Sequence, residues 1–471
     1  MKNIPLNFNS PPRGRGEGIK SKIKITIKSS ALCLLLAFLL TGCGRNTPPR
    51  RSITEFGAVG DGVTLNTKAI QSAIDQCSTN GGATLVVSNG VFVTGSIFLK
   101  QGVNLCVETN AVLKGSQSTN DYPWIDTRIA GLEMKWPAAL INADSVSNLV
   151  LSGTGTIDGS GLPWWEEYWR VRRTDPDGDG LDPHFKVGRP RLVHIIRSQR
   201  VTVRDLLMKD SAFWHLQLTY CDGVLVDNLK VRAPHAPVKA ASSDGIDIDS
   251  TRNVVISNCD IVCDDDAICL KSGRDADGLR VNKPTENVLI KNCRVGHAAG
   301  LVVIGSETSG GIRNVRVTDC RAEDGCQEVV RFKTKMDRGG VVENIVYENI
   351  TADGITSVFT FNMNALAKTW LPEEFRTPVP PEQGTPVFRN ITIRNLKVTN
   401  CKSAGRITGL PQSPLRDILL ENVSIEAEEG FTIQHAIGVR FENVKWNGKL
   451  VASPADSVGR VAARVEGTRV Q

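Results

Sequence analysis

A short motif recurs through the chain at intervals of 21 to 46 residues, and it constrains the fold more than any other feature. Every copy alternates apolar and polar residues, which is the two-residue period of a β-strand. Every copy also carries Asn or Asp near its end, and these residues suit a turn and tolerate left-handed backbone. The nine copies occupy residues 200–206, 223–229, 253–259, 287–293, 314–320, 344–350, 390–396, 417–423 and 438–444, and residues 148–159 resemble an earlier copy.

Strand-built repeats of about 20–50 residues are typical of a solenoid or a propeller. Propeller blades hold four strands in regular blocks, whereas these copies are shorter and irregularly spaced. We therefore predict an all-β fold, a right-handed, single-stranded parallel β-helix in which each coil stacks about 4.8 Å on the last. Small Cys, Val, Ile and Asn side chains should form ladders inside it.

The ends of a solenoid need to be covered. Residues 65–82 predict an N-terminal capping helix, because the apolar residues between Ala69 and Cys77 form one helical stripe. Asn66 is placed to cap the start of this helix, and Gly81 can end it.

The predicted coils define one domain at residues 52–446. The longest gap between copies holds the Pro-rich residues 364–386, which predict a loop rather than a strand. Residues after 446 lack the repeat, so we expect a weakly structured tail at 447–471.

Residues 1–42 have the organisation of a secretory signal. The lysines Lys20, Lys22, Lys24 and Lys28 precede the apolar run at 31–40, which is too short to span a bilayer comfortably. The run ends in Leu-Thr-Gly-Cys, which is similar to the bacterial lipobox, so Cys43 is the expected lipidation site. A plain signal peptide with an incidental Cys43 is the alternative. We expect an exported bacterial lipoprotein of the cell envelope, tethered through residues 43–51.

The formal net charge of +6 comes from this leader. With the seven Lys/Arg and one Glu of residues 1–42 set aside, the 56 basic and 50 acidic residues become 49 of each. A neutral remainder gives no indication of nucleic-acid binding. Ten cysteines follow Cys43, and an exported protein could pair them. Most lie in apolar runs without zinc-site spacing, so we interpret them as small buried residues.

Three consecutive carboxylates stand in front of an apolar strand: Asp264, Asp265 and Asp266. Asp244 precedes Asp265 by 21 residues, about one coil, so it should stack beside them. Like charges at this distance raise at least one carboxyl pKa. A protonated acid beside charged bases is what general acid–base hydrolysis requires. A solvated turn or a calcium site is the alternative for such a group.

Later coils add cationic groups to the same stripe. His297 and then Arg331 follow the acids at intervals of about one coil, and Lys333 shares a strand face with Arg331. Two cations beside acids indicate an anionic substrate. Lys271 and Arg274 could extend the cationic surface, with a solvated position as the alternative for each.

These segments resemble the signatures of glycoside hydrolase family 28, the polygalacturonase family. The sequences SSDGIDID (242–249), DDDAICLKSG (264–273), GHAAGLVVIGSE (296–307) and RFKT (331–334) are similar to its Asn-Thr-Asp, Gly-Asp-Asp, Gly-His-Gly and Arg-Ile-Lys motifs. The resemblance covers most of residues 52–446 and is specific in order and spacing. It implies a parallel β-helix that hydrolyses galacturonosyl links of pectin by single displacement, for which acid and base usually stand about 6.5–9.5 Å apart.

Carried over to this chain, the resemblance makes Asp265 the general acid, while Asp244 and Asp266 hold and deprotonate the water. Arg331 and Lys333 would bind the substrate carboxylate. It implies no cofactor and no metal. The expected partner is an acidic polysaccharide, namely pectin, galacturonan or rhamnogalacturonan, and we expect a monomer that meets the membrane only through its lipid.

The chain departs from the family pattern at three positions. Ser242 replaces Asn, Asp264 replaces Gly, and His297 lies two or three residues before the expected His. Either His297 still reaches the site or the His is missing, as in members that act on rhamnogalacturonan. Residues 271–288 and 305–315 resemble those of bacterial exo-acting members. We therefore expect an exo-acting enzyme, with homogalacturonan and rhamnogalacturonan ends both open.

Two other functions stay open at this stage. A pectate lyase would share the fold but needs calcium-binding carboxylates and a basic proton abstractor, and a surface adhesin would bind polysaccharide without cleaving it. Residues 175–182 have the Asp spacing of a calcium loop but lack Glu at the twelfth position, so a solvated turn is the favoured interpretation. The aromatic residues of 162–170 could stack on sugars or pack beneath a loop.

Overall fold

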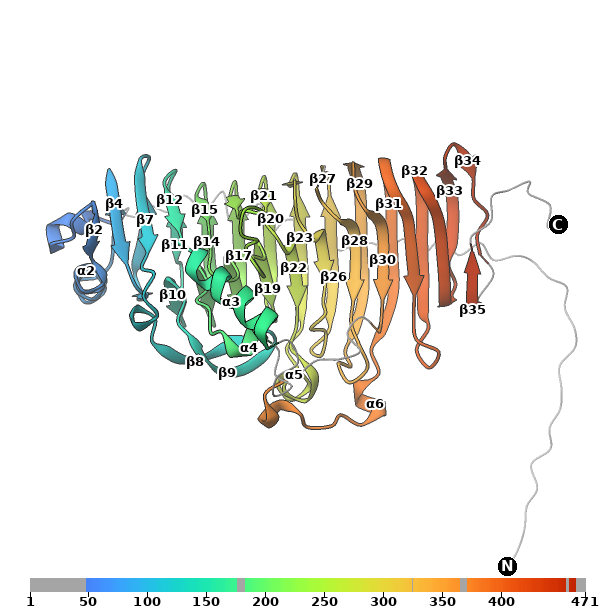
Figure 1. Ribbon diagram of the computed structural model, residues 1–471, viewed down its shortest axis with the longest axis horizontal. Coiled ribbons are helices and arrows are strands. Elements are labelled where there is room, and N and C mark those ends of the chain that lie inside the picture. The colour runs from blue at the N-terminus through green and yellow to red at the C-terminus, as the bar shows by residue number, and fades with distance from the viewer. Residues whose placement is uncertain (1–47, 176–182, 324, 365–370, 455–456, 463–471) are drawn as a thin grey trace, which may run out of the picture. The chain divides into compact units, whose positions relative to one another are not determined.

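The computed structural model describes residues 48–175, 183–323, 325–364, 371–454 and 457–462. The described strands, apart from one hairpin, join a single 33-stranded system whose pairings are almost all parallel. Figure 1 shows successive coils standing side by side along the long axis, in chain order. The predicted right-handed parallel β-helix is confirmed, because each coil returns to pair with the coil before it.

Three parallel sheets run the length of this helix. The first sheet contains the repeated motif and comprises β1 (Arg50–Ser52), β3 (Ala83–Val87), β6 (Val103–Val107), β11 (Val150–Ser152), β14 (Gln199–Arg204), β17 (Asp222–Asp227), β20 (Arg252–Ser257), β23 (Thr285–Lys291), β26 (Ile312–Thr318), β29 (Val341–Asp353), β31 (Val387–Thr408), β32 (Leu415–Ile437) and β33 (Arg440–Trp446). The second sheet comprises β2 (Asp61–Leu65), β4 (Gly90–Thr94), β7 (Ala111–Gly115), β12 (Thr156–Asp158), β15 (Leu207–Lys209), β18 (Lys230–Arg232), β21 (Asp260–Val262), β24 (Arg294–Val295) and β27 (Arg321–Ala322), and it continues into the long strands β29, β31 and β32.

The third sheet carries the candidate site. It comprises β5 (Ile97–Leu99), β10 (Ile141–Asp144), β13 (Val193–Ile196), β16 (Leu216–Thr219), β19 (Ile246–Asp249), β22 (Asp266–Lys271), β25 (Gly300–Ile304), β28 (Glu328–Lys333) and β30 (Ser357–Asn362), and it continues into β31 and β32. Outside the three sheets, β8 (Trp124–Ile129) and β9 (Leu132–Pro137) form an antiparallel hairpin.

Short helices decorate the coils. They are η1 (Ile53–Phe56), α2 (Thr67–Thr79), η2 (Thr119–Asp121), α3 (Leu162–Thr174), α4 (Pro183–Lys186), α5 (Asp275–Val281), η3 (Glu373–Phe375) and α6 (Pro381–Gly384). The predicted loop at 364–386 contains η3 and α6 and no strand among its described residues. No helix in the described part of the chain is long and apolar enough to cross a membrane.

Asparagines stack along the turns of the first sheet, but they do so on the outside. Asn287 Nδ2 donates to Asn253 Oδ1 (3.1 Å), Asn314 to Asn287 (3.2 Å) and Asn344 to Asn314 (3.2 Å), and all four are exposed. Each has a positive φ of 57° to 58°. The predicted internal Asn ladder is therefore wrong, because the left-handed turn that favours Asn lies at the surface, where the side-chain amides bond to each other.

The core inside the coils is apolar and continuous. Phe332 and Phe361 stack with ring centroids 4.5 Å apart, and Val, Ile and Leu fill the neighbouring coils. The ten cysteines in the described residues are free, and all except Cys106 are buried. The interpretation of these cysteines as small buried residues is thus confirmed.

The described domain is longer than the predicted 52–446. Strand β1 begins at Arg50 and pairs with β3, so the last residues of the expected tether belong to the first coil. In the expected tail, β34 (Lys449–Leu450) and β35 (Ser457–Ala462) pair antiparallel with β33 and β32. These strands carry no copy of the repeat, which is why sequence periodicity does not reveal them.

The N-terminal capping helix forms as α2, with Ile70, Ala73, Ile74 and Cys77 buried. Asn66 precedes it, but its side chain makes no hydrogen bond to the helix end. Its Oδ1 instead accepts from the Val59 amide (2.6 Å), and its Nδ2 donates to Thr64 O (2.7 Å). Asn66 therefore occupies the predicted N-cap position, but its side chain fixes the preceding turn instead of bonding to the helix end.

The aromatic group of residues 162–170 lies on α3 and packs inward. Trp164, Trp165 and Tyr168 are buried, and Trp165 Nε1 donates to Ser211 O (3.0 Å). The packing interpretation is confirmed for these three rings, and they offer no stacking platform. Of the possible calcium loop only Asp175 is described, and it pairs with Lys186 (2.6 Å).

Candidate active site

The register of the third sheet brings the predicted site residues together. Ile246 pairs with Ile268, Ile268 with Val302, and Val302 with Val330, so equivalent positions of β19, β22, β25 and β28 form columns across the coils. Asp244 lies two residues before β19, and Asp265 and Asp266 stand at the start of β22. The start of a buried strand therefore fixes the position of each acid.

The three acids form one cluster. One carboxylate oxygen from each of Asp244, Asp265 and Asp266 lies within 4.8 Å of the other two. The Gly245 amide donates to Asp266 O (3.0 Å), which ties the two coils together at this point. The predicted stacking across one coil is confirmed.

The cluster is tighter than the spacing usual for single displacement. Inverting glycosidases keep acid and base about 6.5–9.5 Å apart, and retaining enzymes about 5–5.5 Å. The 4.8 Å limit applies to one oxygen from each of three neighbouring carboxyl groups. The 6.5–9.5 Å range instead applies to one acid and one base on opposite sides of a bound sugar. The stereochemical outcome of the reaction is therefore not assigned from this distance.

Asp266 is fully buried and holds two cations. Lys333 Nζ lies 2.7 Å from Asp266 Oδ2, and Arg331 Nη1 lies 3.1 Å from Asp266 Oδ1. Burial by itself raises the Asp266 pKa, but the positive charges of Lys333 and Arg331 outweigh it and hold this pKa below its usual range. Asp266 is thus the ionised member of the cluster.

Asp265 and Asp244 are shifted in the opposite direction. Burial, followed by the charge of Asp266, raises the pKa of the half-buried Asp265. Burial, followed by the charge of Asp265, raises the pKa of Asp244 well above its usual value. The surroundings therefore favour a proton on Asp265 and Asp244 and a negative charge on Asp266, which is the arrangement that general acid–base chemistry uses.

Lys271 links these acids to two further carboxylates. Its Nζ lies 3.8 Å from Asp244 Oδ2, 3.6 Å from Asp247 Oδ1 and 3.5 Å from Glu307 Oε2, and it sits 5.0 Å from the centre of the Trp214 ring. Lys271 is buried, as is Arg274, which lies near Asp275 (3.9 Å). The surface-solvated alternative is therefore wrong for both residues, although their predicted role in binding substrate stays a prediction.

Asp247 is an unusual member of this network because it is fully buried and neither carboxyl oxygen has a hydrogen-bond partner among the described residues. Burial raises its pKa to about 8, against the opposing charge of Lys271. Between pH ~4 and pH 8 the unfolded chain has therefore lost a proton that the folded chain still holds. Folding stability must fall as pH rises through this interval.

Asp247→Asn should remove this loss of stability. We expect the variant to match the parent near pH 4 and to be more stable above pH 8, by roughly 1.4 kcal/mol for each unit by which the folded-state pKa of Asp247 exceeds its unfolded value. Urea unfolding of both proteins at the two pH values measures the difference. An equal difference in the free energy of unfolding at both pH values would contradict the assignment.

His297 lies beside the cluster and contacts a different acid. Its Nε2 stands 3.0 Å from Asp264 Oδ1, and the same oxygen lies 2.9 Å from His235 Nδ1. Asp264 is the residue that replaces the family Gly, and its side chain is only 1% exposed. The structure thus places His297 next to the acids through Asp264, while its predicted part in catalysis stays a prediction.

The sequence did not reveal several members of this region. Glu307 and Asp247 both lie inside the quoted motifs, and burial beside Lys271 is what distinguishes them from ordinary polar residues. His235 comes from residues 233–241, which follow β18 and carry no motif. Only the coil spacing between His235 and Asp264, 29 residues, could have indicated their contact.

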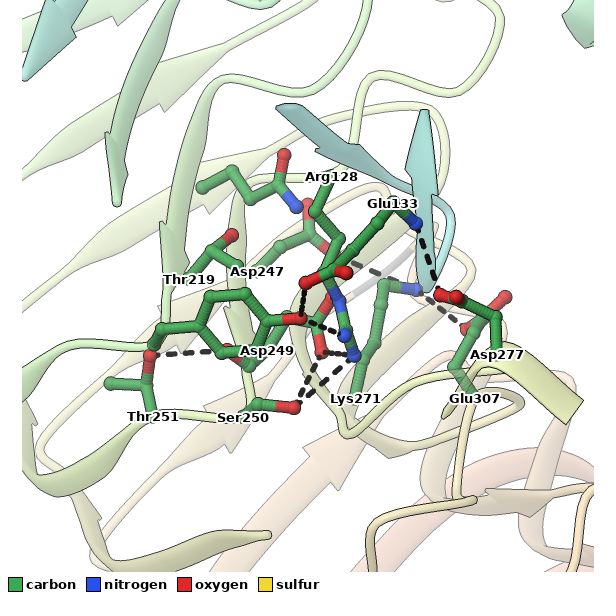
Figure 2. Close-up of polar contacts among 12 residues, drawn as sticks. Arg128, Glu133, Thr219, Asp247, Asp249, Ser250, Thr251, Lys271, Asp277 and Glu307 are labelled. Carbon is green, nitrogen blue, oxygen red and sulfur yellow. Dashed lines mark hydrogen bonds and ion pairs between the residues drawn. The ribbon is translucent and has the colours of Figure 1, made fainter. Parts of the chain in front are cut away.

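The β8–β9 hairpin covers the third sheet on the N-terminal side of the acids. Arg128 of β8 forms a fully buried, two-bonded ion pair with Asp249 of β19, with both N–O distances 2.8 Å. Figure 2 shows Arg128 reaching Asp249 and Ser250 beneath the hairpin. The outward-facing Gln217, Thr219 and Asp247 are fully buried as a result.

A second set of contacts joins the hairpin to α5. Glu133 N donates to Asp277 Oδ2 (3.1 Å), and Arg280 Nη2 donates to Glu133 Oε2 (2.6 Å). Figure 2 shows Glu133 and Asp277 facing each other at this junction. On the other side of the acids, Arg331 and Lys333 retain 25% and 19% of their side-chain exposure. The outer face of the sheet is therefore closed on one side of the cluster and accessible on the other.

Comparisons with known proteins give a consistent result. The family model described as glycosyl hydrolases family 28 matches residues 77–444. A probable polygalacturonase of Vitis vinifera is 32% identical over 387 residues, covering 79% of this chain and 74% of its own. An exo-poly-alpha-D-galacturonosidase of Dickeya chrysanthemi is 28% identical over 340 residues, covering 63% of this chain and 54% of its own. A hyperthermoactive exopolygalacturonase from Thermotoga maritima superposes with a TM-score of 0.75 at 27% identity, covering 89% of this chain and 97% of its own.

Proposed function

Because the chain belongs to glycosyl hydrolases family 28, we propose that it is a glycoside hydrolase that cleaves α-galacturonosyl links of pectin from the chain ends. The observation that carries the proposal is the cluster of Asp244, Asp265 and Asp266 with the cation pair Lys333 and Arg331. The acids supply proton transfer, and the cations supply a site for a uronate carboxylate.

The protonation states divide the work among the acids. Asp265, whose pKa is raised, donates its proton to the glycosidic oxygen. Asp266 is ionised and removes a proton from the attacking water, which Asp244 helps to hold. A substrate carboxylate that binds Lys333 and Arg331 adds negative charge beside Asp266, and this raises its basicity when substrate is present.

The closed side of the sheet supports exo action. A polysaccharide chain can extend past the acids only where the outer face is accessible, and the hairpin buries that face on the N-terminal side. Two similar proteins, from Thermotoga maritima and Dickeya chrysanthemi, are named for exo activity. Homogalacturonan and rhamnogalacturonan ends both present the required uronate.

Product analysis tests the function directly. On polygalacturonate we expect monomeric galacturonate from the first time point and a slow fall in viscosity relative to the release of reducing ends. Unsaturated products that absorb ultraviolet light would indicate a lyase instead, and binding without new reducing ends would indicate an adhesin. Parallel digests of rhamnogalacturonan oligomers decide between the two substrates.

Shortening the β8–β9 hairpin should convert exo into endo action. Replacing residues 125–136 by a short Gly-Ser turn removes Arg128 and opens the face around Asp249. We expect galacturonate oligomers among the early products and a steeper fall in viscosity at equal turnover. The matched control is Glu133→Gln, which keeps the hairpin and weakens the exposed Arg280 ion pair, worth about 0–1 kcal/mol, while Gln can still accept from the Tyr220 hydroxyl. Exclusive release of monomer by a folded, shortened variant would contradict the closed-side explanation.

We further propose that the protein is an exported lipoprotein attached through Cys43. The support is the charged and apolar leader that ends in Leu-Thr-Gly-Cys, since residues 1–47 lie outside the described part of the chain. Cys43→Ser should abolish incorporation of radiolabelled palmitate and release the enzyme from the membrane fraction. Equal labelling of the parent and the variant would exclude lipidation at Cys43.

A further inference from the structure

A second titratable cluster, which the proposed hydrolysis does not use, lies beside the three acids. It consists of His235, Asp264 and His297, which precede β19, β22 and β25 on successive coils. One possible ligand atom from each residue lies within 4.8 Å of the other two. The register of the coils, rather than a flexible loop alone, therefore brings these side chains together.

The two imidazole rings converge on one carboxylate oxygen. His235 Nδ1 lies 2.9 Å and His297 Nε2 lies 3.0 Å from Asp264 Oδ1, and the ring centres are 4.3 Å apart. The other oxygen, Asp264 Oδ2, is buried and has no hydrogen-bond partner among the described residues. A buried carboxylate with one unsatisfied oxygen is costly unless a further cation or donor reaches it.

We propose that His235, Asp264 and His297 form a binding site for a divalent transition-metal ion, with Zn²⁺ as the preferred ion. Two imidazole nitrogens and one carboxylate oxygen make a three-ligand set that leaves a coordination position open. Imidazole ligands disfavour Ca²⁺ and Mg²⁺, which select oxygen.

The two nitrogen–oxygen distances agree with this assignment. Zinc bonds of about 2.0–2.2 Å at tetrahedral angles place neighbouring ligand atoms about 3.3 Å apart. The two observed nitrogen–oxygen separations, 2.9 and 3.0 Å, need to lengthen only slightly. The His235 side chain is 60% exposed, so its ring is free to adjust and an ion can enter from solvent.

The Lys239 ammonium group would compete with a metal ion for the Asp264 carboxylate. Its Nζ lies 3.3 Å from Asp264 Oδ1, and its side chain is 41% exposed. A bound ion would take over the neutralisation of Asp264, and Lys239 could then turn toward solvent. Removing the lysine charge should therefore strengthen metal binding.

Metal binding by the full chain tests the proposal. Titration calorimetry with Zn²⁺ should show one site, and Co²⁺ should give the visible absorption of a low-symmetry complex. His235→Asn, His297→Asn and Asp264→Asn should each weaken binding by more than the 10–100-fold typical of outer-shell partners. Lys239→Met should tighten it.

The matched control is His435→Asn. His435 lies outside the cluster at a φ of 50°, which Asn tolerates, and its replacement should leave the affinity unchanged. Circular dichroism checks the fold, and the exposed His235 keeps the test valid should the more buried variants fail to fold. Absence of saturable Zn²⁺ binding to the parent protein would overturn the proposal, as would binding of unchanged affinity in folded His235→Asn.

Discussion

Asp265→Asn should lower kcat on polygalacturonate by about 10²- to 10⁴-fold, the usual contribution of one general acid. Asp265 is the half-buried carboxyl whose pKa is raised by burial and by Asp266, so it can hold the proton that the departing sugar oxygen needs. Asparagine keeps the shape of the side chain but cannot donate that proton as an acid. Reducing-end release at saturating substrate measures the loss.

The choice of leaving group separates proton donation from other roles of Asp265. An aryl galacturonide with an acidic phenol leaves without much assistance, so Asp265→Asn should cost far less activity on this substrate than on polygalacturonate. Asp126→Asn, at an 87% exposed position of the hairpin, is the matched control and should retain full activity. An equal loss on both substrates would mean that Asp265 does not act as the general acid. Melting temperatures should be no lower for Asp265→Asn, because the uncharged amide adds no negative charge beside the ionised Asp266.

Lys333→Met should lower kcat/KM by about 30- to several-thousand-fold. This corresponds to a loss of roughly 2–5 kcal/mol of transition-state stabilisation. Lys333 Nζ lies 2.7 Å from Asp266 Oδ2 and is proposed to bind the substrate carboxylate, so the substitution removes both contacts. KM should rise as well as kcat fall. Initial rates over a range of galacturonan concentrations separate the two parameters.

The pH profile distinguishes the two roles of Lys333. In the parent protein, Lys333 and Arg331 hold the Asp266 pKa low, so the base remains ionised well into the acid range. Without Lys333 the Asp266 pKa rises, and the acid limb of the kcat/KM profile should move to higher pH. Lys335→Met changes a nearby lysine that pairs with Asp275 and should leave that limb in place. A loss of kcat/KM that is equal at every pH would mean that Lys333 acts only in substrate binding.

The folding stability of the protein should also depend on the ionisation of Asp266. A carboxyl whose folded-state pKa is depressed stabilises the fold above its unfolded pKa of ~3.9, and this contribution disappears as pH falls toward the folded-state value. Asp247 acts in the opposite sense, since its contribution is lost as pH rises toward 8. The two buried acids therefore limit the stable range from opposite sides.

Sequence periodicity was sufficient to predict the coils and the position of the acids, because both depend on strand spacing. Asp244 and Asp266 meet since they occupy equivalent positions one coil apart, which counting residues can predict. The same counting placed Arg331 and Lys333 on the same stripe as the acids. Family motifs then supplied the roles, which spacing alone cannot provide.

The rest depends on contacts that periodicity does not encode. The hairpin reaches the site through Arg128 and Asp249, which are 121 residues apart in the chain. The β8–β9 hairpin contributes to the burial of Lys271. The sequence alone therefore could not show whether this charged residue is buried or exposed. Asparagine is a residue type that commonly caps helices, yet the Asn66 side chain bonds to the turn before the helix instead.

The way in which the coil stack ends has a consequence for solubility. An open end of a parallel β-helix presents unpaired amides and carbonyls that a second chain can extend, which leads to end-to-end fibres. Here α2 lies over the first coils, whereas β34 and β35 run antiparallel to the last ones. Reversed strands interrupt the template, because an incoming coil of the same sequence would need a parallel neighbour. The short elements at the two ends thus act as barriers to polymerisation of a fold that could otherwise grow without limit.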